Sequence, residues 1–102
     1  MQELDKEKTF ENAVLFIRNG TTTDVSKTLK LQYYALYKQA EVGPCSLHGG
    51  EQPSYFNYID RMKWGVWNNL EEMSSTTAKQ RYIEMLNEYN PNWNKIKLKS
   101  IL

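Results

Sequence analysis

Cysteine and histidine each occur only once among the 102 residues. One thiol cannot form an internal disulfide, and Cys45 with His48 is too small a set of soft ligands for a zinc site. We therefore expect no metal or other cofactor, and a reducing compartment such as the cytoplasm. A thiol–imidazole catalytic pair is conceivable because the two residues are close in sequence. No pattern supplies an oxyanion hole or orients the pair, so we expect no enzyme.

The sequence also lacks a strong net charge. The formal net charge is +1 and the pI is about 7.8, so no global basic field favours binding to nucleic acid. No apolar run approaches the length of a membrane-spanning helix, and the N-terminal residues lack the apolar core of a signal peptide. We expect a monomeric cytoplasmic protein that does not insert stably into a membrane.

Apolar residues recur at helical spacing in four stretches, and no strand pattern has convincing length. The predicted helices span residues 9–19, 26–42, 59–71 and 75–89. Thr9 is the expected cap of the first helix, Asp24 or Ser26 of the second, and Ser74 or Ser75 of the fourth. Residues 43–58 are rich in glycine, proline and serine and predict a long loop. The chain therefore predicts an all-α, four-helix domain.

Within the second predicted helix, two kinds of side chain occupy separate faces. One apolar arc, expected to face the core, contains Leu29, Tyr33, Leu36 and Ala40. Tyr34, Tyr37 and Lys38 form a second stripe about 120° away. Phenol rings can stack on a flat heterocycle, and an ammonium group beside them can bind an anion. This stripe is the first candidate for a ligand site.

Two further cations have alternative interpretations. Arg18 lies in the last turn of the first predicted helix, where it either complements the helix dipole or binds a ligand. Lys63 lies one turn before Trp67, and either extends along apolar neighbours to water or contacts a phosphate. We expect Trp64 and Trp67 to belong to the core, because aromatic stripes usually supply buried area.

The sequence resembles the acyl-CoA-binding protein family at many positions that occur in the same order. The matching positions are Tyr34, Tyr37, Lys38, Gln39, Ala40, Gly43, Pro53, Lys63, Trp64, Trp67, Leu70, Ala78, Tyr82 and Ile83. This resemblance implies an up-down-down-up four-helix bundle that binds and carries long-chain fatty acyl-CoA esters without catalysis. It assigns residues 1–91 to the binding domain and leaves 92–102, with Lys95, Lys97 and Lys99, as a lysine-rich tail.

The resemblance also implies roles for individual residues. Tyr34, Lys38 and Lys63 would hold the 3′-phosphate of the ligand, Tyr37 would face the adenine, and Arg18 and Tyr82 would complete the head-group site. Ala35 and Leu36, within the same motif, are expected binding residues too. Secondary or acyl-groove contacts are expected from Ala13, Lys30, Leu31 and Arg61.

Some positions depart from the family pattern. Lys30 stands where relatives usually place an apolar residue, and Ile59 replaces a frequent lysine whose charge Arg61 can supply.

A different class of function is a helical module that docks on proteins or membranes, with the tail as its contact, and does not bind acyl-CoA.

Overall fold

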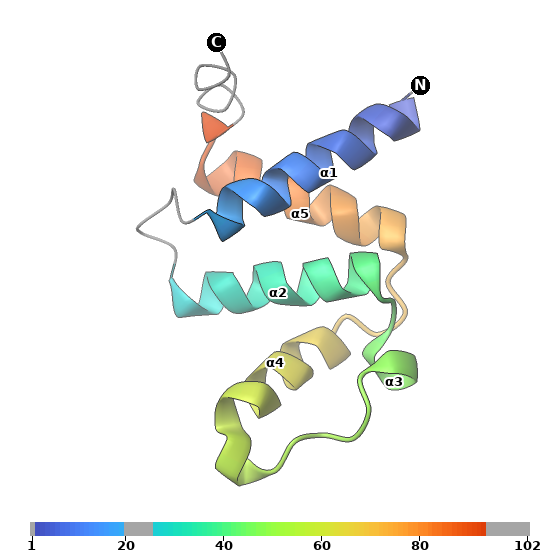
Figure 1. The fold of residues 1–102 in the computed structure, drawn as a ribbon, viewed down its shortest axis with the longest axis vertical. Coiled ribbons are helices and arrows are strands. Elements are labelled where there is room, and N and C mark those ends of the chain that lie inside the picture. Colours follow the sequence, from blue (N-terminus) through green and yellow to red (C-terminus); the bar gives the residue numbers. More distant parts are fainter. Residues whose placement is uncertain (1, 20–25, 94–102) are drawn as a thin grey trace.

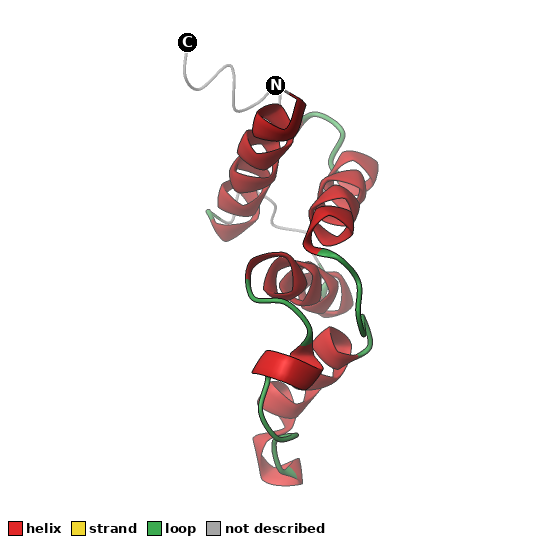
Figure 2. Ribbon diagram, turned by 90° about the vertical axis from the view of Figure 1, so that its right-hand side faces the viewer, coloured by secondary structure: helices red, strands yellow, loops and turns green. Residues whose placement is uncertain are grey.

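The structure is a computed structural model that describes residues 2–19 and 26–93. Four longer helices form the bundle: α1 (Gln2–Arg18), α2 (Lys27–Glu41), α4 (Tyr58–Asn68) and α5 (Ser75–Tyr89). α1 and α5 run in one direction and α2 and α4 run in the opposite direction, which is the predicted up-down-down-up order (Figure 1). The described residues contain helices and loops but no strands (Figure 2).

The predicted loop between α2 and α4 contains two short helices, α3 (Cys45–His48) and the 3₁₀ helix η1 (Tyr55–Asn57). Sequence patterns do not reveal such single turns, because they are too short to show a period. The loop prediction was therefore wrong at these seven residues.

Two predicted boundaries of the longer helices were also wrong. α1 begins at Gln2, because residues 2–8 are mostly strong helix formers and contain no breaker, so Thr9 lies inside the helix and is not its N-cap. α4 ends at Asn68, three residues early: the N–H groups of Leu70 and Glu71 donate to carbonyls only three residues back, which tightens the chain out of the α-helix.

The two serine caps agree with the sequence. The hydroxyl of Ser26 accepts the N–H of Leu29 at 3.2 Å, and the hydroxyl of Ser74 accepts the N–H of Thr77 at 3.1 Å. Each bond satisfies a donor that the first helical turn leaves free, which fixes where α2 and α5 begin.

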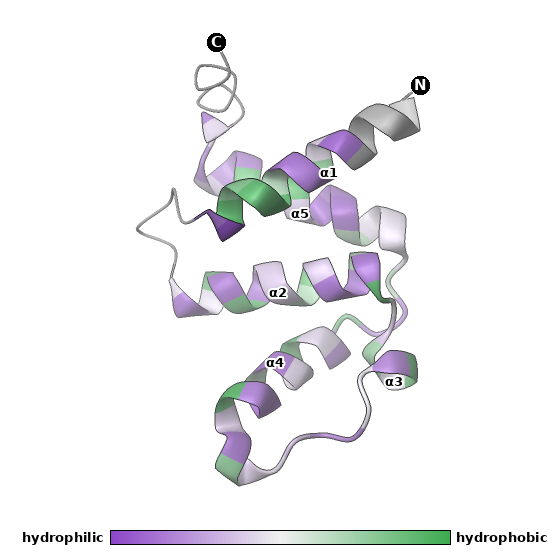
Figure 3. Ribbon diagram, viewed as in Figure 1, coloured by the Kyte–Doolittle hydropathy of each residue, from purple (hydrophilic) through white to green (hydrophobic). Residues whose placement is uncertain are grey.

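The main core lies where α5 packs between α1 and α2. Its buried members are Phe10, Ala13, Val14, Phe16, Tyr33, Leu36, Ala40, Ala78, Tyr82, Leu86 and Trp93. Figure 3 shows hydrophobic residues in the C-terminal half of α1. The rings of Phe10 and Tyr33 pack on Tyr82 with centroids 5.3 and 5.0 Å away, so one tyrosine of α5 joins all three helices.

Trp93 lies beyond the predicted end of the domain but is only 1% exposed. Its ring packs on Phe16, with centroids 6.0 Å apart, and its indole N–H donates to the side-chain oxygen of Asn87 at 2.9 Å. The packed domain therefore reaches at least to this residue. The three lysines predicted for the tail lie outside the described residues.

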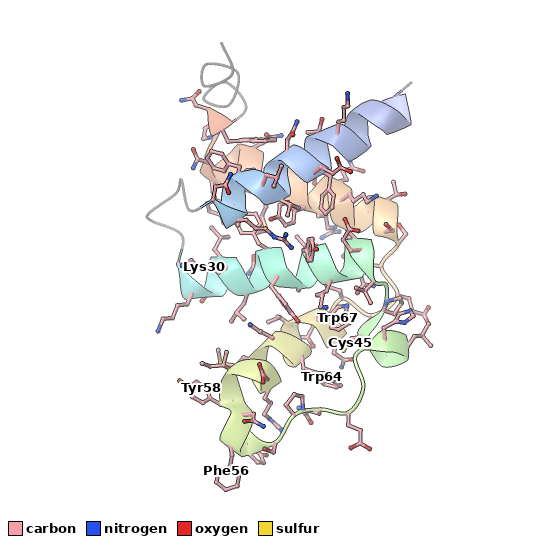
Figure 4. All side chains as sticks on the ribbon, viewed as in Figure 1. Lys30, Cys45, Phe56, Tyr58, Trp64 and Trp67 are labelled. Atoms are coloured by element: carbon pink, nitrogen blue, oxygen red, sulfur yellow. The ribbon has the colours of Figure 1, made fainter. Side chains whose placement is uncertain are left out.

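A second, smaller core joins α2, α3 and α4 around Ala35, Cys45 and Trp67. The indole N–H of Trp67 donates to the carbonyl of Gly43 at 2.9 Å, and that of Trp64 donates to the carbonyl of Gly50 at 3.2 Å. Figure 4 shows Cys45, Trp64 and Trp67 gathered where α3 meets α4. These tryptophans hold the long connection on the bundle, as expected for core residues.

Gln39 fastens the α4–α5 connection to α2. Its side chain is fully buried, and its amide group donates to the carbonyls of Glu71 at 3.0 Å and Met73 at 2.8 Å. Glu71 has a φ of 53°, a left-handed conformation that is uncommon outside glycine. Two hydrogen bonds from one side chain thus hold a tight turn in place beside α2.

Candidate functional site

The aromatic and cationic stripe of α2 lines a groove of about 310 Å³ between α1, α2 and α5. Its lining residues are Val14, Ile17, Arg18, Lys30, Tyr33, Tyr34, Tyr37, Lys38 and Tyr82. Three cations and four phenol rings surround apolar side chains of α1, and no carboxylate lines the groove. This composition suits a ligand that has an anionic part, a flat part and an apolar part.

Arg18 crosses from the end of α1 to α2. One of its guanidinium N–H groups donates to the hydroxyl of Tyr37 at 3.0 Å, and its Cζ atom lies 5.1 Å from the centroid of the same ring. The exposed guanidinium keeps further donors for an anion. Arg18 therefore does more than end its own helix.

Lys63 of α4 is not among the lining residues, but it contacts one of them. Its Nζ atom lies 5.4 Å from the centroid of the Tyr34 ring, within the range of a cation–π contact. Lys38 lies in the groove wall, with Nζ 5.3 Å from the ring centroid of Trp67. The ammonium groups of Lys38 and Lys63 thus each lie over an aromatic ring.

Burial raises the pKa of the phenols of Tyr33, Tyr34 and Tyr82 further above neutral pH. Burial, and secondarily the charges of Cys45 and Asp60, raise the pKa of Tyr34. Burial also raises the pKa of Tyr33 to about 12. For Tyr82, burial and then Tyr33 raise the pKa above that of an exposed tyrosine, although nearby Arg18 acts in the opposite direction. At neutral pH these hydroxyls are therefore hydrogen-bond donors.

The structure does not bring every predicted residue to this groove. Ala35 is buried against Cys45 and Trp67, and Ala13 and Leu36 are buried in the main core. Leu31 is half-buried on α2 and is not among the lining residues. Lys30 does line the groove, at the end away from Lys38.

Arg61 also points elsewhere. It donates to the carbonyl of Pro53 at 2.9 Å, and its Cζ atom lies 4.1 Å from the ring centroid of Tyr55. It braces the approach to α4 and does not line the groove.

Three lining residues were not predicted as site residues: Val14, Ile17 and Tyr33. All three share a helical face with core residues, and helical periodicity favours a core role for such positions. The one signal in the sequence was the hydroxyl of Tyr33, because a buried phenol hydroxyl needs a hydrogen-bond partner.

A larger groove of about 490 Å³ lies on another face, between α2, α4 and α5. Its wall includes Arg81 but also the carboxylates of Glu84 and Glu88, and it contains no aromatic ring. An anionic ligand would meet like charges there, so the smaller groove is the better candidate.

Comparison with known proteins addresses the identity of this fold directly. The family model described as "Acyl CoA binding protein" matches residues 7–86. The chain belongs to the acyl-CoA-binding protein family. Membership in this family supports binding of acyl-CoA, and the matched region corresponds to a binding domain with no catalysis of its own.

Individual relatives agree with this assignment. The chain is 38% identical over 82 residues to acyl-CoA-binding protein homolog 3 of Caenorhabditis elegans, covering 78% of this chain and 68% of the relative. It is 37% identical over 91 residues to acyl-CoA-binding domain-containing protein 4 of Oryza sativa, covering 89% of this chain and 26% of the relative. It is 34% identical over 86 residues to enoyl-CoA delta isomerase 2 of Homo sapiens, covering 84% of this chain and 21% of the relative. The chain thus spans about a quarter of the length of the last two.

Solved structures show the same fold. The solution structure of the acyl CoA binding protein from Babesia bovis superposes with a TM-score of 0.71 at 36% identity, covering 83% of this chain and 93% of that one. The crystal structure of the protein named ACBP from Moniliophthora perniciosa has a TM-score of 0.74 at 24% identity, covering 91% and 92% of the two chains.

Among the described residues, no group of three or more histidine, cysteine, aspartate or glutamate side chains could hold a metal ion. None of the described helices combines the length and the apolar character that crossing a membrane requires.

Proposed function

We propose that this chain binds long-chain fatty acyl-CoA esters in the groove of α2 and carries them as a monomeric cytoplasmic pool former and transporter, without catalysis. The observation that carries the proposal is the groove itself: Arg18, Lys38 and Lys63 lie on or beside the rings of Tyr37, Trp67 and Tyr34, and no carboxylate lines it. Binding of acyl-CoA by relatives supports the class of ligand.

The head group is proposed to occupy the end of the groove near Lys38. There the ammonium groups of Lys38 and Lys63 and the protonated hydroxyl of Tyr34 contact the 3′-phosphate, while the ring of Tyr37 faces the adenine. Arg18 is held on Tyr37 by a hydrogen bond, so its guanidinium is already oriented before a ligand arrives. Tyr82 completes this end from α5.

The acyl chain is proposed to follow the apolar part of the groove along Val14 and Ile17 toward Lys30. A buried methylene is worth roughly 0.8 kcal/mol, so about a dozen sheltered methylenes contribute on the order of 10 kcal/mol before the costs of association. The acyl chain therefore supplies affinity. The phosphate contacts supply specificity, because a free fatty acid leaves the cations of the site unpaired.

Isothermal titration with palmitoyl-CoA, CoA and palmitate tests the proposal. We expect strong binding of palmitoyl-CoA, weak binding of CoA and weaker binding of palmitate. Comparable weak heats for all three ligands would overturn it. Lys38→Ala and Tyr34→Phe should weaken palmitoyl-CoA binding; if both leave it unchanged, these residues only pack, and a helical docking module is the better account.

A further inference from the structure

Large hydrophobic side chains are exposed together on η1 and the first turns of α4. The exposed fractions are 78% for Tyr55, 96% for Phe56, 62% for Tyr58, 54% for Ile59 and 45% for Met62. These five residues, which we name the aromatic tip, are five of the nine large hydrophobic residues exposed in the described part of the chain. Isolated exposed hydrophobic residues are common, but a contiguous group marks a contact surface.

The aromatic tip is held in an exposed position by polar contacts. Arg61 donates to the carbonyl of Pro53 at 2.9 Å and lies 4.1 Å from the ring centroid of Tyr55, which braces η1 against α4. Figures 1 and 4 show η1 and the start of α4, with Phe56 labelled, at the end of the molecule farthest from α1. The rings therefore project outward on a braced support and do not fold back onto the bundle.

The helical positions of the tip also point outward. At 100° per residue, Tyr58, Ile59 and Met62 fall within about 100° of one another on α4, on the side away from the buried Trp67. Phe56 adds a ring just before this helix. The result is an exposed apolar end that lines neither of the two grooves, whereas small-molecule sites are concave.

The chemistry of the tip matches the interface of a phospholipid bilayer. Tyrosine and phenylalanine rings with an adjacent arginine suit this zone, where rings enter the acyl boundary and cations meet lipid phosphates. Arg61 and Lys63 supply two cations on α4, and Asp60 is the one carboxylate on this helix, so cations outnumber carboxylates there.

We propose that the aromatic tip docks the protein on a phospholipid bilayer surface, with Phe56 and Tyr55 inserted into the interface. Lys63, on the same helix as part of the tip, lies 5.4 Å from the ring centroid of Tyr34, which lines the ligand groove. Docking by the tip therefore brings α4, which carries a proposed head-group contact, to the membrane surface. This inference goes beyond the proposed ligand binding and concerns a separate surface.

Co-sedimentation with vesicles of phosphatidylcholine, alone or mixed with phosphatidylserine, tests the proposal. Phe56→Ser should lower the vesicle partition coefficient about tenfold, since one inserted ring is worth roughly a factor of ten or more. Leu47→Ser is the matched control, because Leu47 is 74% exposed on α3 outside the tip and should leave binding unchanged. Both side chains are exposed, so neither change should affect folding.

Three results would overturn the proposal. The first is a wild-type protein that does not bind either vesicle. The second is equal binding by wild type and Phe56→Ser, which would assign any membrane contact to another surface such as the lysine-rich tail. The third is concentration-dependent self-association that Phe56→Ser abolishes, which would make the tip an interface between two copies. Palmitoyl-CoA affinity in solution should be the same in wild type and Phe56→Ser, so this test and that of the proposed function fail independently.

Discussion

Replacement of Gln39 by alanine should destabilise the fold more than the replacement of an exposed polar residue on the same helix. The change removes two hydrogen bonds to the carbonyls of Glu71 and Met73, at about 1 kcal/mol net each. It also empties a fully buried site, which adds roughly 1–2 kcal/mol. The side-chain oxygen of Gln39 has no partner among the described residues, and losing it returns about 1 kcal/mol.

The expected loss is therefore about 2–3 kcal/mol in the free energy of unfolding, or about 10–20 °C in Tm for a domain of this size. Thermal unfolding followed by circular dichroism measures it. Gln32→Ala is the matched control, because Gln32 is exposed on the same helix and should change stability by less than about 0.5 kcal/mol. Gln39→Leu keeps most of the volume and should lose only the hydrogen-bond share. Equal Tm values for Gln39→Ala and Gln32→Ala would refute the role given to these two bonds.

Three further predictions concern pH, thiol chemistry and ligand length. Burial raises the pKa of Tyr33 to about 12, so both the folded and the unfolded state keep its proton below pH 10, and only the unfolded state loses it between about pH 10 and 12. The free energy of unfolding should therefore fall over this pH range by up to about 3 kcal/mol. Denaturant titrations of Tyr33→Phe should show a less steep fall. Cys45 is 1% exposed and burial raises its pKa, so the native protein should resist a thiol reagent that titrates one group after unfolding; fast native labelling would contradict this. Lys30→Met should tighten palmitoyl-CoA binding about threefold by calorimetry while leaving CoA unchanged; a parallel change for CoA would place Lys30 beside the head group.

Helical periodicity predicted the four long helices because each buries one face. It failed where structure depends on something other than a repeated apolar face. The first turns of α1 are a run of strong helix formers without an apolar period, and α3 and η1 are single turns held by contacts such as those of Cys45 with Trp67 and of Tyr55 with Arg61. Trp93 could not be assigned from its polar neighbours in the sequence, since its burial depends on residues far away along the chain, such as Phe16.

The candidate site was predictable where it lies on one helix. The stripe of Tyr34, Tyr37 and Lys38 follows from the angular spacing of α2. The approach of Arg18 and Lys63 does not, because it depends on how α1 and α4 lie against α2; the family resemblance supplied it. Sequence spacing also could not show that Arg61 turns toward Pro53 and Tyr55, away from the groove.

The head-group assignment has one direct test: calorimetric dissociation constants of palmitoyl-CoA and palmitoyl-3′-dephospho-CoA, for wild type and Lys63→Met. Wild type should bind the dephosphorylated ligand about 10–100-fold more weakly, because it loses charge-assisted hydrogen bonds worth roughly 1.5–3 kcal/mol. Lys63→Met should discriminate much less between the two ligands, since one phosphate partner is already gone. Equal affinities of wild type for both ligands would contradict a phosphate site at Tyr34, Lys38 and Lys63.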